Sequence, residues 1–236
     1  MDDLTTKAQA ELAGRPRPAG PSAGPRPQEV PAERLLHAHE LAVSFYTGRL
    51  HTAPDGYRAR ALLADRGIDA ATAGRARLGY APRAWTPLLD QLRTAGFTDG
   101  ELLGSGLAIR TSRGTLVDRF RDRVVFPVTD IAGRTVALIG RAVDGTATDR
   151  SGAPVPKYLN SPDTALYRKG QALYGLGPAR SALAAGARPV LVEGPMDALA
   201  VDLAHACARA AGHEGSGFVG VAPCGTALTA TQVDLL

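Results

Sequence analysis

Val190-Leu191-Val192-Glu193-Gly194-Pro195-Met196-Asp197-Ala198-Leu199-Ala200 is the stretch that decides how the C-terminal part of this 236-residue chain folds. Its first three residues are a short apolar strand, the next three are a turn, and an Ala-rich helix is expected from Met196 to Ala211. Phe218–Ala222 is a second apolar strand. The order strand, helix, strand predicts a parallel α/β sheet, and Thr229–Leu236 predicts the start of a further helix.

Two acidic residues of this stretch are expected to share one rim of the sheet. Glu193 directly follows the strand, and Asp197 comes four residues later in the first helical turn. Ligands of parallel sheets bind outside the carboxyl ends of the strands, and carboxylates suit Mg²⁺, which keeps several waters and bridges to phosphates. The pattern predicts a Mg²⁺ or Mn²⁺ site at Glu193 and Asp197. A helix-capping Glu193 beside a solvated Asp197 fits the same pattern equally well.

The chain before this stretch divides into segments of different composition. Residues 1–31 contain the run AGRPRPAGPSAGPRPQEVP, which is too rich in Pro, Gly and Ala to bury a core and predicts a disordered tail or linker. From residue 32, helical spacing predicts helices at 35–46 (ended by Gly48), 57–66, 68–76 and 87–95, with a Gly-Tyr-Ala-Pro break at 79–82. Trp85 and Phe97 are expected in the core. After residue 107, strands at 124–128 and 135–140 flank an Asp-x-x-Gly turn and predict a β-hairpin.

Positive charge gathers in one segment. Residues 101–180 hold 12 Lys or Arg against 7 Asp or Glu, whereas the whole chain holds 27 against 23. Arg119, Arg121 and Arg123 alternate with Phe120, so their guanidinium groups are expected on one side of a strand edge, where they could contact the phosphates of single-stranded DNA. For any single arginine, a surface charge paired with a neighbouring aspartate is the alternative.

The same segment carries the ingredients of a nucleotide site. Lys157, Tyr158 and Asn160 provide a cation, an aromatic plane and an amide within four residues. Arg141 follows the end of a predicted strand, and Lys169 is one of only three lysines in a chain with 24 arginines. These five residues are predicted to bind a nucleotide through its phosphates and base.

Several motifs resemble the catalytic core of bacterial DnaG-type DNA primases in order and spacing. They are Asp118-Arg119-Phe120-Arg121-Asp122-Arg123-Val124-Val125-Phe126-Pro127, Ile139-Gly140-Arg141, PKYLNSPDT at 156–164, Lys169-Gly170, Leu173-Tyr174-Gly175-Leu176, LADRGI at 63–68, LGYAP at 78–82 and GTALT at 225–229. The run Glu193-Gly194-x-x-Asp197 is similar to the first signature of the Toprim fold of primases, topoisomerases and some nucleases. The resemblance covers residues 35–236.

The resemblance implies a fold and a function. It implies an α+β primase-core subdomain of helices and a β-hairpin at 32–187, followed by a partial, Rossmann-like α/β Toprim subdomain at 188–236. It implies a DNA primase, which makes RNA primers on single-stranded DNA from ribonucleoside triphosphates, with Glu193 and Asp197 as catalytic metal ligands. It also adds Arg66 to the nucleotide contacts.

The chain departs from that family pattern in several places. No zinc-binding domain precedes residue 32, no Asp-x-Asp follows Cys224, and no helicase-interacting C-terminal domain is present. We therefore expect a half-built metal site, no primer synthesis by this chain alone, a replicative helicase as a partner only through a missing domain, and an unpaired strand edge at Phe218–Ala222. Pro195 stands where the bacterial replicative enzymes usually have Tyr, which indicates a divergent relative.

Other features bound the class of protein. Cys207 and Cys224 lie in no zinc motif and are expected to be reduced and structural. The chain has neither a signal peptide nor a run of about 18 apolar residues, so a cytoplasmic protein without a membrane segment is expected.

Three other functions remain open. A non-catalytic module that binds single-stranded nucleic acid and nucleotide, left from a split or truncated primase, would bind DNA in a salt-dependent way without polymerising. A Toprim nuclease would share Glu193 but would not need the motif around Lys157. A general α/β nucleotide-binding protein would need a Gly-rich phosphate loop, and the sequence contains neither common form.

Overall fold

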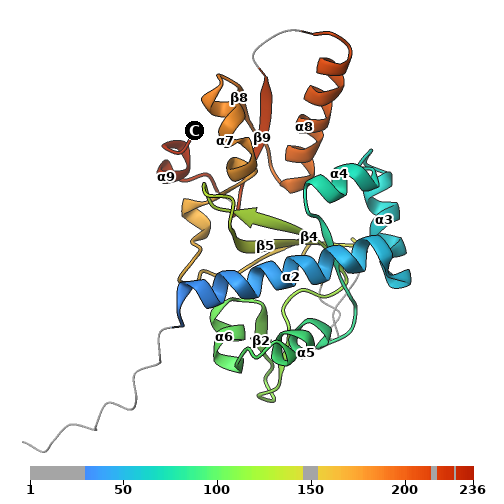
Figure 1. Cartoon of the computed structure of the whole chain (residues 1–236), viewed down its shortest axis with the longest axis vertical. Coiled ribbons are helices and arrows are strands. Elements are labelled where there is room, and N and C mark those ends of the chain that lie inside the picture. Colours follow the sequence, from blue (N-terminus) through green and yellow to red (C-terminus); the bar gives the residue numbers. More distant parts are fainter. Residues whose placement is uncertain (1–29, 146–153, 214–216, 226) are drawn as a thin grey trace, which may run out of the picture.

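The computed structural model describes residues 30–145, 154–213, 217–225 and 227–236, which form an α+β fold (Figure 1). The helices are α2 Ala32–Thr52, α3 Tyr57–Ala64, α4 Ala70–Arg75, α5 Pro87–Thr94, α6 Asp99–Gly104, α7 Leu176–Ala184, α8 Pro195–Ala210 and α9 Ala230–Val233, with 3₁₀ turns η1 Pro54–Gly56 and η2 Lys169–Gln171. The strands are β1 Gly79–Ala81, β2 Ala108–Arg110, β3 Leu116–Asp118, β4 Arg123–Thr129, β5 Thr135–Ala142, β6 Tyr158–Asn160, β7 Leu173–Tyr174, β8 Arg188–Leu191 and β9 Phe218–Pro223.

Helix α2 lies between the β4–β5 sheet and the unit that contains α5 and α6 (Figure 1). The prediction that it ends at Gly48 is wrong, because α2 continues to Thr52. A glycine in a helix costs only about 1 kcal/mol relative to alanine, and burying Leu50, which is 1% exposed, offsets that cost. The helix ends where Ala53 turns extended, as expected for a residue before a proline.

The predicted β-hairpin is confirmed, and it sits in a larger antiparallel sheet of order β1-β4-β5-β6. Its turn is closed by the amide of Gly133, which donates to the carbonyl of Asp130 at 3.0 Å. The expected break at 79–82 is wrong for its first three residues, which form β1 and pair with β4. A side chain at Gly79 would meet Tyr46, since an added Cβ would lie 2.4 Å from the Tyr46 Cβ. The glycine is therefore needed for close packing of β1 on α2.

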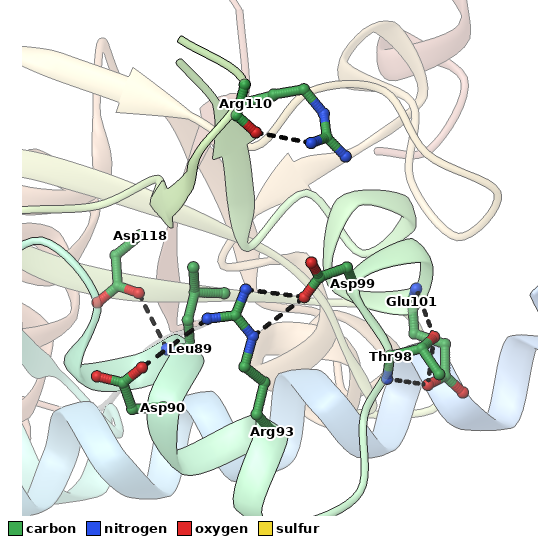
Figure 2. A network of polar contacts seen from close by, with 9 residues as sticks. Leu89, Asp90, Arg93, Thr98, Asp99, Glu101, Arg110 and Asp118 are labelled. Atoms are coloured by element: carbon green, nitrogen blue, oxygen red, sulfur yellow. Dashed lines mark hydrogen bonds and ion pairs between the residues drawn. The ribbon is translucent and has the colours of Figure 1, made fainter.

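The small unit of α5, α6 and the β2–β3 hairpin is held by capped helix ends (Figure 2). The buried carboxylate of Asp118 accepts hydrogen bonds from the amides of Leu88 and Leu89, both at 3.0 Å, at the start of α5. Burial raises the pKa of Asp118 to about 6, although these two amides act in the opposite direction. Thr98 and Glu101 form a reciprocal capping box at the start of α6. These caps satisfy amides that would otherwise be left unpaired in the interior.

Trp85 and Phe97 have different environments. Phe97 is buried, as predicted, whereas the expectation of a core position for Trp85 is wrong because its side chain is 49% exposed. The guanidinium of Arg121 lies over the Trp85 ring, 4.3 Å from its centroid. The indole is therefore partly covered by a cation.

The C-terminal half contains the predicted strand, helix, strand unit. Strands β8 and β9 are parallel and are connected through α8. The expectation of an unpaired edge at Phe218–Ala222 is wrong for Ala222, because β7 pairs antiparallel with Ala222 and Pro223 and gives the order β7-β9-β8. Within the described residues, β7 and β8 are the edge strands of this sheet. The short β7 was missed because two residues carry no periodicity.

One hydrophobic cluster joins the two halves of the fold, which are the β1-β4-β5-β6 sheet with its helices and the β7-β9-β8 sheet with α8. It includes Val124 and Phe126 of β4 together with Met196 and Leu199 of α8 and Ala222 of β9. The predicted boundary at residue 188 stays a prediction, and β7 lies before it in the chain while its partner β9 lies after it. The predicted tail at 1–31 lies outside the described residues except for its last two. No helix in the described ranges is long and apolar enough to cross a membrane.

Candidate functional site

A cleft of about 860 Å³ opens between the two halves, at the carboxyl end of β8. One wall comes from β5, β6 and η2, and the other comes from the β8–α8 turn and the end of β9. The lining residues are Ile139, Tyr158, Asn160 and Lys169 on the first side and Leu191, Val192, Glu193, Gly194, Pro195, Pro223 and Gly225 on the second. The sequence motifs around Lys157 and Glu193 therefore meet at one place, although they lie more than thirty residues apart.

Tyr158 lies near the centre of the predicted nucleotide site. Burial raises its pKa, the nearby Arg141 and Arg66 act to lower it, and Asp197 acts to raise it. Arg141 also hydrogen-bonds the phenol through its side chain. These interactions bring side chains from the end of α3, from β5 and from α8 into one electrostatic environment. Tyr158 packs over Gly194, where an added Cβ would lie 3.5 Å from its hydroxyl oxygen.

Arg141 is buried to 93% of its surface, and its Nε has no hydrogen-bond partner within the described part of the chain. A buried guanidinium nitrogen without a partner is costly. Arg66 follows α3 and is exposed. Neither arginine is among the residues that line the cleft itself.

Asn160 lines the cleft, but it also holds the two halves together. Its side-chain amide donates to the carbonyl of Cys224 at 2.5 Å. Its own carbonyl accepts two hydrogen bonds from Arg119, from Nε at 3.1 Å and from Nη2 at 2.8 Å. This bridge could not be predicted from local patterns, because it joins residues 64 positions apart. Binding of a nucleotide by Asn160 stays a prediction.

The two predicted lysines occupy different positions. Lys169 begins the η2 turn and lines the cleft, and its backbone amide donates to the Asp163 carboxylate at 3.0 Å. Lys157 is exposed, lies outside the lining residues, and places its Nζ 5.8 Å from the centroid of the Tyr158 ring. The structure therefore puts Lys169 in a more direct position to meet a ligand in the cleft.

The expected arginine track on one strand edge is wrong in its geometry. Strand β3 ends at Asp118 and β4 begins at Arg123, and between them Asp122 has a left-handed φ of 51°. Arg121 donates to the carbonyl of Asp118, and Arg123, 5% exposed, donates to three backbone carbonyls. Burial lowers the pKa of both guanidinium groups and that of Arg119. DNA contact by these arginines stays a prediction, and their bonding favours a structural role.

The two predicted metal ligands are exposed at the rim of the cleft. Glu193 lies two residues after the end of β8, and Asp197 lies in the first turn of α8, whose first residue is Pro195. Within the described residues, His, Cys, Asp and Glu side chains form no group of three or more that could hold a metal ion. Two exposed carboxylates beside the cleft fit a largely hydrated Mg²⁺, which binds proteins through one or two carboxylates.

Sequence reasoning missed one contact to this site. Thr229 and Gln232 of the C-terminal segment hydrogen-bond the backbone of the η2 turn that carries Lys169. The Thr-x-x-Gln pattern was the available signal, since it is a capping box at the start of a helix. The spacing of Thr229 and Gln232 does not show which backbone carbonyls their side chains bond outside the capping box.

Comparison with known proteins identifies the family. Residues 45–180 match the model for the N-terminal domain of the DNA primase catalytic core. The chain belongs to the bacterial DnaG-type primase family. It is 40% identical over 203 residues to the DNA primase of Streptomyces coelicolor, and this alignment covers 86% of the chain. It is 43% identical over 176 residues to the DNA primase of Deinococcus radiodurans, covering 74% of the chain.

Solved primase structures share the fold. The RNA polymerase domain of Mycobacterium tuberculosis primase DnaG, in complex with double-stranded DNA, superposes with a TM-score of 0.74 at 31% identity, covering 87% of this chain and 59% of that one. A DnaG primase catalytic domain bound to single-stranded DNA gives a TM-score of 0.70 at 32% identity, covering 86% and 57%. The chain spans less than a third of the length of the curated relatives, 29% and 27% for the two above.

Proposed function

We propose that this chain is the part of a DNA primase that binds nucleoside triphosphate and template for the synthesis of RNA primers on single-stranded DNA. The observation that carries the proposal is the cleft, which places Tyr158 and Lys169 on one wall and Glu193 on the other. Membership of the primase family gives this juxtaposition its chemical meaning.

The cationic groups suit a triphosphate. Lys169 would contact the phosphates as a point charge, and the unpartnered Nε of Arg141 would donate to a further oxygen. Tyr158 would place its aromatic face beside the base or ribose. Arg66 and Lys157 would add positive potential near the entrance, and Asn160 would act from the floor of the cleft while it bridges the halves.

Glu193 and Asp197 would hold Mg²⁺ or Mn²⁺ at the rim. The metal, when bound, neutralises charge on the triphosphate and activates the attacking hydroxyl. The protein's own contribution is to keep two carboxyl groups near the carboxyl end of β8, on the wall opposite Lys169. Further carboxylates would strengthen this site. The proposal assigns no zinc to any of these residues.

Nucleotide binding is tested by titrating a fluorescent ribonucleoside triphosphate in the presence of Mg²⁺. Lys169→Ala should weaken binding about tenfold or more, the usual scale for a desolvated charge contact, and the exposed Arg113→Ala should leave it unchanged. Glu193→Gln should remove the Mg²⁺ dependence of binding. Equal affinities for wild type and Lys169→Ala would contradict the assignment of the cleft.

Template binding is tested with a labelled single-stranded oligonucleotide over a range of salt. Affinity should fall steeply as salt rises, because contacts to phosphates release counterions. Primer synthesis by the same sample, with ribonucleotides and Mg²⁺ or Mn²⁺, measures activity, and Glu193→Gln is its control. Because no primer synthesis is expected from this chain alone, DNA and nucleotide binding without synthesis fits both the proposal and the non-catalytic module. Synthesis that Glu193→Gln abolishes would exclude the non-catalytic module, and cleavage of the template would favour the nuclease.

A further inference from the structure

The C-terminal helix α9 is fastened to the turn that carries Lys169. Thr229 and Gln232 form a capping box, in which the Thr229 amide donates to the Gln232 side chain at 3.0 Å and the Gln232 amide donates to the Thr229 hydroxyl oxygen at 3.2 Å. The helix has only four residues. Its end is therefore organised mainly by these two side chains, which are thereby aimed at the neighbouring turn.

Both side chains also bond the η2 turn. The Thr229 hydroxyl donates to the carbonyl of Gly170 at 2.6 Å. The Gln232 side-chain amide donates to the carbonyls of Lys169 at 2.9 Å and Ala172 at 2.7 Å. Gln232 is fully buried, and its amide nitrogen and oxygen are both engaged. A buried glutamine with all these bonds made is rigidly placed, since breaking any of them leaves an unpaired polar group.

This contact connects the two walls of the cleft. Lys169 stands on one wall, and Pro223 and Gly225 stand on the other, at the end of β9 and a few residues before Thr229. The backbone carbonyls of Lys169, Gly170 and Ala172 accept hydrogen bonds from the side chains of Thr229 and Gln232. Both donors lie in the chain segment that continues the opposite wall. The placement of Lys169 across from Glu193 is thus set in part by α9.

We propose that Gln232, assisted by Thr229, is a positioning residue for nucleotide binding that acts through Lys169. This inference rests on the proposed nucleotide-binding function of Lys169. Among the described residues, the Gln232 side chain hydrogen-bonds Thr229, Lys169 and Ala172 and no residue of the wall that carries Glu193. Its effect on a ligand should therefore be carried by the lysine.

A double-mutant cycle on the full chain tests this. Gln232→Leu keeps the approximate size of the side chain and removes the bonds to Lys169 and Ala172. It should weaken the binding of a fluorescent ribonucleoside triphosphate by about five- to tenfold, the scale expected when hydrogen bonds that order a binding group are lost. In a Lys169→Ala background the same substitution should have no further effect, because two residues that act through one contact are not additive.

Thr231→Ala is the matched control, because Thr231 is exposed on the same short helix; it should leave affinity unchanged. Amide hydrogen exchange at Gly170 and Gln171 should accelerate in Gln232→Leu and not in the control. Thr229→Val loses the bond to Gly170 and the cap on the Gln232 amide but keeps the Gln232 side-chain bonds to Lys169 and Ala172. It should show a smaller loss of affinity of about two- to threefold, and it replaces Gln232→Leu if that variant does not fold.

The outcomes separate the inference from the function on which it rests. If Lys169→Ala leaves nucleotide affinity unchanged, the proposed function of Lys169 and the inference both fail. If Lys169→Ala weakens binding while Gln232→Leu does not, only the inference fails. A loss that adds in full to that of Lys169→Ala would show that Gln232 acts on general stability, which also overturns it.

Discussion

Substitution of Arg123 by methionine distinguishes a structural arginine from a DNA-binding one. The guanidinium is 5% exposed, and its Nη1 lies 2.9 Å from the Pro156 carbonyl oxygen, 3.1 Å from that of Gly140 and 3.5 Å from that of Lys157. Methionine keeps an unbranched apolar stem and removes all three contacts. The backbone that leads into β6 and Tyr158 then loses its tie to β4.

The expected cost follows from these contacts. Hydrogen bonds from a charged donor contribute about 1.5–3 kcal/mol each, and two of the three are short. Burial of the guanidinium, which lowers the pKa of Arg123, offsets part of this gain. We expect a net loss of about 3 kcal/mol in the free energy of unfolding, which lowers Tm by roughly 6–12 °C for a chain of this size.

The assay is thermal unfolding followed by circular dichroism, together with binding of a labelled single-stranded oligonucleotide well below Tm. Arg123→Met should lower Tm and leave DNA affinity within about twofold. Arg113→Met, at an exposed arginine, is the control for a change of charge alone. An unchanged Tm with a tenfold loss of DNA affinity would refute the structural reading and restore the arginine track.

Three further predictions follow from buried groups. Because burial raises the folded-state pKa of Asp118 to about 6, the folded protein binds this proton more tightly than the unfolded chain does. The contribution of Asp118 to stability is therefore largest near pH 4 and decreases by up to about 3 kcal/mol as the pH rises to 7. Urea unfolding of Asp118→Asn should lack this decrease, and parallel pH profiles for variant and wild type would contradict the prediction. Gly175→Ala should lower the free energy of unfolding by at least about 2 kcal/mol, since φ is 86° and an added Cβ would lie 2.4 Å from the Gly220 carbonyl oxygen. Gly186→Ala is the control for backbone strain alone, because Gly186 also has a positive φ but an added Cβ there would meet nothing within 4 Å. Equal losses of stability in the two variants would exclude the steric clash with Gly220. Iodoacetamide should label the exposed Cys207 quickly and the buried Cys224 only on unfolding; mass spectrometry that finds both labelled in the native protein would show that the β9 end opens.

Much of the fold could be predicted because its signals are local. The hairpin around Asp130, the strand, helix, strand unit around Glu193 and the helix stops before Gly67 and Gly96 all follow from periodicity and turn chemistry within a few residues. The family motifs then identified the primase core. The prediction that both cysteines are reduced and structural is wrong in part for Cys207, which is free but has an exposed side chain. That prediction rested only on the small number of cysteines.

What could not be predicted depends on distant partners. The two residues of β7 become a strand only because β9 is present, and Gly79–Ala81 becomes a strand because β4 offers an edge. The alternation of Arg119, Arg121 and Arg123 suggested a strand, but the left-handed Asp122 interrupts it. Their carbonyl acceptors lie between 3 and 41 positions away. A charged side chain with a remote backbone partner looks the same in sequence as one that faces solvent.

The shared hydrophobic cluster bears on how this chain responds to a protease. The turn at Gly186 is exposed, and a cut there would leave β7 and α7 on one fragment and β8, α8 and β9 on the other. Because β7 pairs with β9 and the apolar side chains of α8 pack with those of β4, the nicked protein should migrate as one particle in gel filtration and separate only under denaturing conditions. The two fragments should therefore complement each other as one folding unit, so cleavage of the covalent chain at Gly186 does not by itself separate them.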